Sequence, residues 1–200
     1  MSDLSSLTNR VCLLIVSVAT NSEKFALNDK AVSEVIAVIK RVEAPAVGFE
    51  ASRIFANSIK SLTSDQNKHI EAVARLSQPD VIEVFVSLLR RTVKYPLLTN
   101  DAIISLALVA TFGPDGSGEQ SFSIPFGPCG QRADISAKLV LDELSREQEV
   151  KSEEEVVSGK EVLAKIVSTG EETFSNEIRA NTATLLTQLK ESTGGDLLQS

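Results

Sequence analysis

The apolar residues of this chain recur every three or four positions in several separate segments, a spacing that predicts helices rather than strands. The clearest segment is 49–62, whose apolar and small residues fall on a common helical face. The same frame recurs at 101–109 and more faintly at 177–184, with a weaker echo at 10–19. We interpret these segments as equivalent helices of a repeated structure, as in a helical solenoid.

Polar residues and prolines divide the chain into units with one order of elements: a short helix, a longer helix and a long inner helix. Pro45, Pro79 and Pro96 are expected to separate helices. The helices at 81–91 and 100–110 are apolar nearly all round, so we expect neighbouring helices to cover them on two sides. The expected helices are 8–19, 23–27, 30–42, 49–62, 64–76, 81–91, 100–110, 134–146, 160–167 and 176–189.

We predict a single domain over 1–200 with an inserted loop at 112–131, which holds five glycines and three prolines. The repeated frame supports the insertion, because 51 residues separate the first two equivalent positions and 76 separate the next two. Helical repeats of this kind span roughly 40–47 residues. An acidic connection around 153–155 and a disordered tail at 192–200 complete the expected layout. The absence of a clear polar cap is compatible with a segment of a longer array.

The composition supports an all-α fold. Hydrophobic residues make up 42% of the chain, whereas aromatic residues make up only 4% and tryptophan is absent. Cores of leucine, isoleucine, valine and alanine are typical of stacked helices, while strands are enriched in aromatic and β-branched residues.

Charge is distributed unevenly along the chain. Residues 1–110 carry a net charge of +1 and residues 111–200 a net charge of −8. Nucleic-acid binding without sequence preference needs a basic face, so the acidic half argues against it. Two interpretations stay open: an acidic face that fits a basic partner, or a surface that only keeps the protein in solution.

The sequence offers no catalytic or metal-binding constellation. His69 is the single histidine, and Cys12 and Cys129 have no ligand spacing. The glycines at 113–118 are not followed by the Lys-Ser/Thr pair that a phosphate-binding loop requires. We therefore expect no enzyme activity, no cofactor and no metal.

Cysteine use and hydropathy together predict a location. Two distant cysteines make no disulfide framework, and the apolar run at 11–19 is too short to cross a bilayer. We expect a cytoplasmic protein that does not insert into membranes.

Several segments carry a resemblance to a known family. The segments 31–39, 48–62, 100–110 and 177–181 are similar in order and pattern to the C-terminal armadillo repeats of the smgGDS family, the GDP-dissociation stimulators of small GTPases. In 49–62, an asparagine near the middle resembles the position that faces the concave surface of an armadillo repeat. The resemblance covers about residues 20–190 without most of the loop. It implies an armadillo-like, right-handed superhelical solenoid of about three repeats with a loop insertion.

The resemblance also implies a function. Family members hold Rho- or Rap-type GTPases, often prenylated and with a basic tail, on the concave face. They stimulate exchange of GDP for GTP, or act as chaperones, without catalytic chemistry of their own. This chain is shorter than full family members, which leaves open whether it stimulates exchange independently or binds a prenyl group.

The candidate partner-binding residues follow from the same frame. Arg53 and Asn57 are four residues apart and share a helix face. In the alternative interpretation, Asn57 bonds within a neighbouring repeat and Arg53 pairs with Glu50. Leu108 and Thr184 replace asparagine at the later equivalent positions, which favours a folded partner over an extended peptide. The full candidate set is Glu50, Arg53, Asn57, Asn100, Glu177 and Asn181.

Two other functions fit the sequence. One is a general armadillo or HEAT adaptor in a larger complex. The other is a structural segment of a longer solenoid without a separate activity.

Overall fold

The structure is a computed structural model that describes residues 21–42, 45–64, 69–113, 134–149, 156–169 and 173–193. Over these ranges the fold is all-α apart from one short hairpin, as the helical spacing predicted. The elements are α2 (Ser22–Ala26), α3 (Asp29–Arg41), α4 (Pro45–Thr63), α5 (Ile70–Leu76), α6 (Pro79–Arg91), α7 (Pro96–Phe112), α8 (Asp134–Ser145), β1 (Glu147–Glu149), β2 (Val156–Ser158), α9 (Gly159–Ser168) and α10 (Asn176–Thr193).

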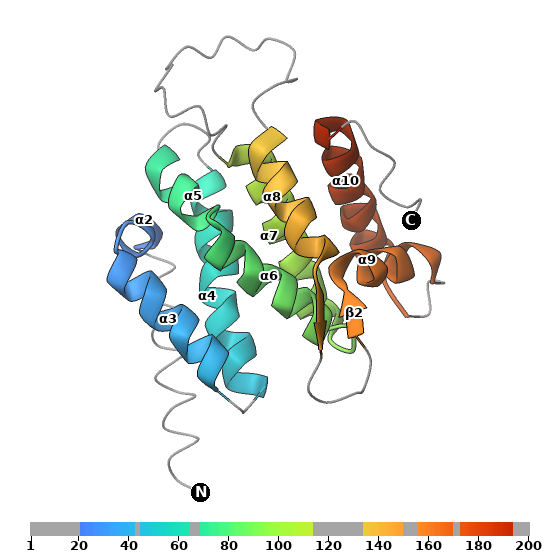
Figure 1. Ribbon diagram of the computed structural model, residues 1–200, viewed down its shortest axis with the longest axis horizontal. Coiled ribbons are helices and arrows are strands. Elements are labelled where there is room, and N and C mark those ends of the chain that lie inside the picture. Colours follow the sequence, from blue (N-terminus) through green and yellow to red (C-terminus); the bar gives the residue numbers. More distant parts are fainter. Residues whose placement is uncertain are drawn as a thin grey trace, which may run out of the picture.

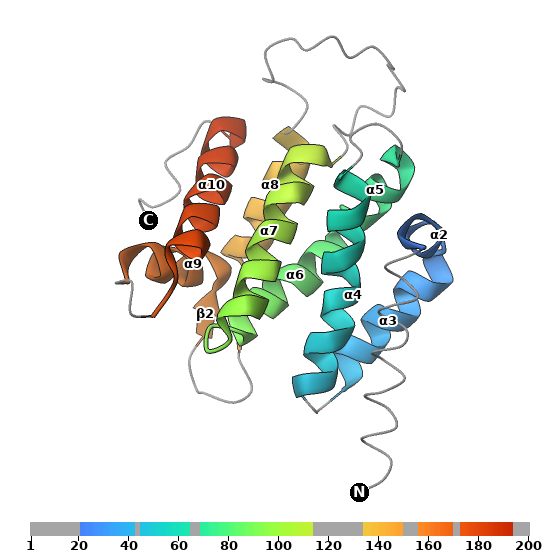
Figure 2. The same cartoon turned by 180° about the vertical axis from the view of Figure 1, so that it is seen from behind.

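The helices form two layers (Figures 1 and 2). In the inner layer, α7 lies between α4 and α10 and packs against both (Figure 2). In the outer layer, α3, α6 and α8 cover the other side of these helices (Figure 1). We call α2–α4, α5–α7 and α8–α10 the first, second and third unit, and helices of successive units contact each other: α2 with α5, α3 with α6, and α6 with α9. The three segments that share the repeated frame therefore lie in one layer.

The prolines lie at the boundaries between helices, as expected, and each also begins the helix that follows it. Pro45, Pro79 and Pro96 are the first residues of α4, α6 and α7. Proline suits this position because its fixed φ fits the helix, and the first N–H of a helix has no partner within it. As a result α4 and α7 each start about one turn earlier than the apolar pattern indicated.

Local capping explains where two of the other helices begin. The Asn28 side chain accepts a hydrogen bond from the Ala31 N–H at 3.1 Å and caps α3. Ser158 and Glu161 form a reciprocal capping box at the start of α9. His69, expected within a helix, instead precedes the first residue of α5. The expected helix at 8–19 and nearly all of the expected loop at 112–131 lie outside the described residues.

A short hairpin replaces part of the acidic connection, where we had not expected strands. Strands β1 and β2 are antiparallel, with Glu147 opposite Ser158 and Glu149 opposite Val156. The adjacent valines at 156 and 157 have the β-branched side chains that favour strands. The acidic run 153–155 lies outside the described residues. At the far end α10 continues to Thr193, two residues into the expected tail.

The core lies between the two layers. Helix α6 packs on α3, α4, α7, α8 and α9, which confirms that it is covered nearly all round, and Phe85 is fully buried. The other apolar helix, α7, packs on α6 and α8 on one side and on α4 and α10 at its two flanks. On the opposite side Ile104, Ala107 and Leu108 are half-buried. The expectation that neighbouring helices cover α7 on two sides is confirmed, and only the face opposite α6 and α8 has no other described helix packed on it.

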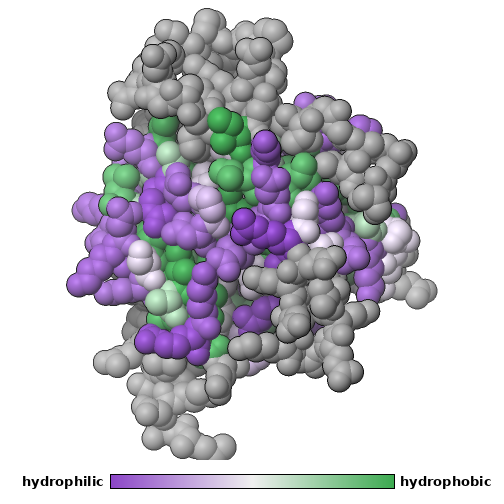
Figure 3. Space-filling model, viewed as in Figure 1, coloured by the Kyte–Doolittle hydropathy of each residue, from purple (hydrophilic) through white to green (hydrophobic). Residues whose placement is uncertain are grey.

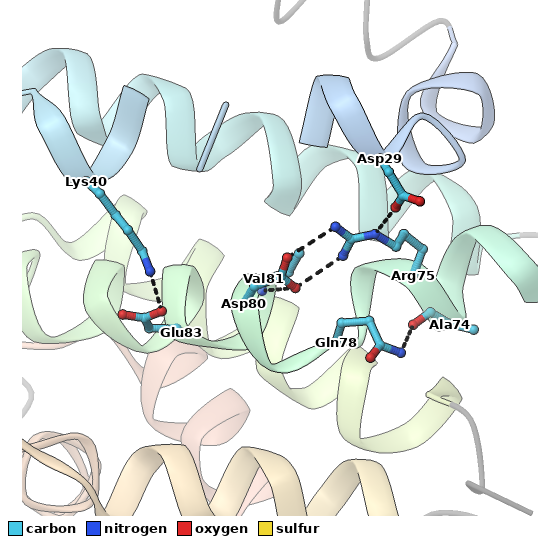
Figure 4. A network of polar contacts seen from close by, with 8 residues as sticks. All are labelled: Asp29, Lys40, Ala74, Arg75, Gln78, Asp80, Val81 and Glu83. Carbon is cyan, nitrogen blue, oxygen red and sulfur yellow. Dashed lines mark hydrogen bonds and ion pairs between the residues drawn. The ribbon is translucent and has the colours of Figure 1, made fainter. Parts of the chain in front are cut away.

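Ion pairs join the first two units in the outer layer (Figure 4). Arg75 Nε lies 2.6 Å from Asp29 Oδ1, and its two Nη atoms each lie 3.1 Å from an oxygen of Asp80. Lys40 Nζ donates to Glu83 Oε2 at 2.8 Å. Hydrophilic residues cover much of the described part of this outer face (Figure 3).

A buried arginine joins the second unit to the third. Arg90 is 7% exposed, and its Nη2 donates to the backbone carbonyl oxygens of Glu143, at 3.2 Å, and of Arg146. These carbonyls belong to the C-terminal end of α8, where a positive charge is favourable. Burial lowers the pKa of Arg90, and the nearby Glu143 and Glu83 carboxylates oppose that effect. The guanidinium thus holds α8 against α6.

Candidate functional site

The predicted contacts on α4 share one side of the helix because they are three or four residues apart. Arg53 Nη1 lies 3.4 Å from Glu50 Oε1, so the structure contains the internal pair weighed as the alternative. Arg53 Nε also lies 3.6 Å from Asp101 Oδ2 on α7, and Lys60 Nζ pairs with the other oxygen of that carboxylate. The Asp101 carboxylate of α7 therefore lies between two cations of α4, Arg53 and Lys60, and connects the two helices.

The predicted contacts on α7 and α10 come together across the next pair of inner helices. Asn181 Nδ2 donates to Asn100 Oδ1 at 2.8 Å, and Asn100 Nδ2 donates to Glu177 Oε1 at 3.4 Å. This chain of hydrogen bonds runs from α10 to α7 and back to α10. Its geometry holds the two helices together, whatever else these side chains bind.

Asn57 differs from the other five predicted residues. It is half-buried on α4 and makes no hydrogen bond within the described part of the chain. The alternative in which it bonds within a neighbouring repeat is therefore not seen among these residues. Its amide is left available to a partner.

A groove lies between α7 and α10 on the uncovered side of the inner layer. Its volume is about 140 Å³ and it is open to solvent. Helix α7 contributes the mainly apolar wall and α10 contributes polar side chains. The lining residues are Ile104, Ala107, Leu108, Thr111, Asn181, Thr184 and Gln188.

The groove occupies the positions that the repeated frame marks as equivalent to Asn57. Those positions are Leu108 and Thr184, and both line the groove. The sequence argument used these two residues only to note that asparagine is absent. It missed Ile104 and Gln188, although each lies four residues from a marked position, a spacing that puts it on the same helix face.

The electrostatics of the groove point to binding of an uncharged group. None of its seven lining residues is charged. Gln188 Oε1 is buried and has no hydrogen-bond partner among the described residues. A phosphate or a carboxylate would find no cation in this lining. An apolar side chain with a nearby N–H donor would find both an apolar wall and an acceptor.

Elsewhere the structure shows little that could support chemistry. His69 Nδ1 lies 3.2 Å from Glu23 Oε1, a contact between the start of α5 and α2, outside the inner layer. Within the ranges given above, no group of three or more His, Cys, Asp or Glu could hold a metal ion. No helix in the same ranges has both the length and the apolar character needed to cross a membrane.

Comparisons with known proteins leave the chain without an assigned family. No protein-family model, curated protein or solved structure matches it.

Proposed function

We propose that this protein is a non-enzymatic scaffold that binds a folded protein partner on its inner layer. In this proposal the units form an armadillo-like, right-handed superhelical solenoid, and α4, α7 and α10 supply the concave face. The observation that carries the proposal is the groove beside Leu108, on the side of the inner layer where no other described helix packs; helical spacing from Arg53 places the amide of Asn57 on the same layer.

The partner class we propose is a small GTPase of the Rho or Rap type. This choice rests on the resemblance of segments 31–39, 48–62, 100–110 and 177–181 to the smgGDS repeats. The scaffold would stimulate release of GDP if its inner face bound the nucleotide-free GTPase more tightly than the GDP-bound form. A tenfold shift of that equilibrium requires a difference in binding free energy of about 1.4 kcal/mol. A scaffold that binds both forms equally would act only as a chaperone.

Release of a fluorescent GDP analogue from purified Rho- and Rap-type GTPases tests the proposal. We expect the full chain to accelerate release from at least one of them, or to capture it without acceleration if it is a chaperone. Asn57→Ala should weaken the effect, because it removes the free amide from the inner face.

Gln78→Ala is the matched control, since Gln78 is an exposed amide on the outer side whose Nε2 donates to the Ala74 carbonyl at 3.2 Å (Figure 4). It should leave release and capture unchanged. Unaltered release together with no capture across the whole panel would contradict the proposal.

A further inference from the structure

We infer that the groove between α7 and α10 is an anchor site for one branched apolar side chain of a partner polypeptide, bound together with a neighbouring backbone amide. The inference rests on the proposed function for the identity of the partner. The groove itself, and the chemistry of its occupant, can be tested without any GTPase.

The first argument comes from α7. Residues 102–112 contain no charged side chain, and an α-helix that is apolar on all sides is normally buried on all sides. Here Ile104, Ala107 and Leu108 remain half-buried on the uncovered side. Exposed apolar surface in a cleft commonly marks a binding site. Something apolar would complete the packing of this helix.

The second argument comes from the size and polarity of the groove. A volume of about 140 Å³ holds a single aliphatic side chain rather than a helix or a cofactor. The lining carries no charge, so it selects against phosphates, carboxylates and ammonium groups. The occupant is therefore a neutral, branched apolar group.

The third argument concerns the wall formed by α10. The buried oxygen of Gln188 lacks a hydrogen-bond partner in the described part of the chain, and such a group costs free energy until it finds a donor. A rotation of the amide toward the groove would let it accept a hydrogen bond from a backbone N–H of the partner. The Thr184 hydroxyl, which donates to the Ala180 carbonyl at 2.9 Å, can still accept a second bond.

The residues that would contact the partner at this site differ from the partner-binding residues predicted from the sequence. Arg53, Asn100 and Asn181 are already engaged in bonds within or between the inner helices. Leu108 and Thr184, which take the place of Asn57 in the later units, become the main contacts. Recognition at this site is then apolar rather than ionic.

N-acetyl-L-leucinamide is a suitable probe because it offers one branched side chain and amide N–H donors without a charge. In an NMR titration of the full chain, we expect saturable shifts of the methyl signals of Ile104, Ala107 and Leu108. The dissociation constant should be on the order of 1–10 mM, as for other ligands of this size. N-acetylglycinamide, which lacks the side chain, and N-acetyl-L-lysinamide, which is charged, should give no saturable shifts.

Two variants locate the site. Leu108→Arg and Thr184→Arg should each abolish the saturable shifts, and Thr184 is exposed, so the fold should tolerate its replacement. Leu97→Arg is the control, because Leu97 is 83% exposed and lies in the first turn of α7, outside the groove lining. If a GTPase binds, the two groove variants should weaken binding at least about tenfold and the control should not.

The outcomes separate the two proposals. Absence of saturable shifts with N-acetyl-L-leucinamide, or equal shifts with N-acetylglycinamide, overturns the anchor site even if a GTPase binds. Saturable shifts that the groove variants abolish support the anchor site, even if no GTPase binds and the proposed partner class fails.

Discussion

The junction between the first and second units and the junction between the second and third units are built differently. Charged side chains connect the first junction on both layers: Arg75 and Lys40 outside, and the Asp101 carboxylate inside between Arg53 and Lys60. The second junction relies on neutral amides inside, where Asn100 meets Asn181, and on a buried guanidinium bound to backbone carbonyls outside. The open groove described above lies at the second junction.

This difference shows how neighbouring units of one frame can take separate tasks. Side chains that reach across the first junction engage one another, as Arg53 and Lys60 of α4 do with Asp101 of α7. At the second junction α7 presents small and aliphatic residues and α10 presents threonines and amides, which do not fill the space between the helices. The groove is then the place where the side chains between α7 and α10 leave space.

The largest expected loss of stability comes from a substitution in α7, the helix that both junctions share. Leu106 on α7 is fully buried. Leu106→Ala should lower the free energy of unfolding by about 2–5 kcal/mol, because it removes buried methyl groups and leaves a cavity. Urea denaturation of the full chain measures the change. Leu97→Ala, at an exposed site on the same helix, should alter stability by no more than about 0.5 kcal/mol. Similar losses for both variants would contradict the placement of α7.

The next largest expected loss of stability concerns the second junction alone. Arg90→Met retains most of the aliphatic volume and removes the donors to the carbonyls of Glu143 and Arg146. We expect a loss of about 2–3 kcal/mol, because these hydrogen bonds are charge-assisted and buried. Amide hydrogen exchange should then rise first in α8. A loss spread evenly over all helices would argue against a local role for this arginine.

A smaller change in stability is expected for the hydrogen bond between the Asn100 and Asn181 amides at the same junction. In a double-mutant cycle of Asn100→Ala and Asn181→Ala, the coupling free energy should be about 0.5–1.5 kcal/mol, the value of one ordinary hydrogen bond. Because only one member of the network, Glu177, is charged, the coupling should change little with salt. A coupling near zero would mean that the 2.8 Å contact between Asn181 and Asn100 does not persist in solution.

The smallest effect is expected at the first junction. Arg75→Met should cost less than about 1 kcal/mol, since its partners Asp29 and Asp80 have side chains that are 81% and 42% exposed. The cost should shrink further between 0.1 and 1 M salt, roughly as the screening length falls from about 10 to 3 Å. Measuring the same salt series for Arg90→Met sharpens the contrast, because a buried contact should respond much less. An equal salt response in both variants would remove the distinction between the junctions.

Sequence reasoning located the helices well but misread their starts. Apolar spacing identified nearly every described helix, because a helix that packs on a core must repeat its apolar positions every three or four residues. Pro45, Pro79 and Pro96 separate successive helices as expected, but only the structure showed that each is also the first residue of the next helix, a position that favours proline. The hairpin was missed because two strands of three residues are too short to show a pattern of alternation.

The candidate site was predictable only in part. The repeated frame marked Leu108 and Thr184, which both line the groove, whereas Asn57 on α4 does not line it. It could not indicate that Arg53 pairs with Glu50 and also reaches Asp101, because that contact depends on the distance between α4 and α7.

The sequence by itself determined the helical class and the approximate position of most described helices, since these depend on local spacing. Only the tertiary structure decided which polar side chains engage one another and where a groove remains between helices. Those outcomes depend on how closely neighbouring helices approach, which is set by packing among residues far apart in the chain.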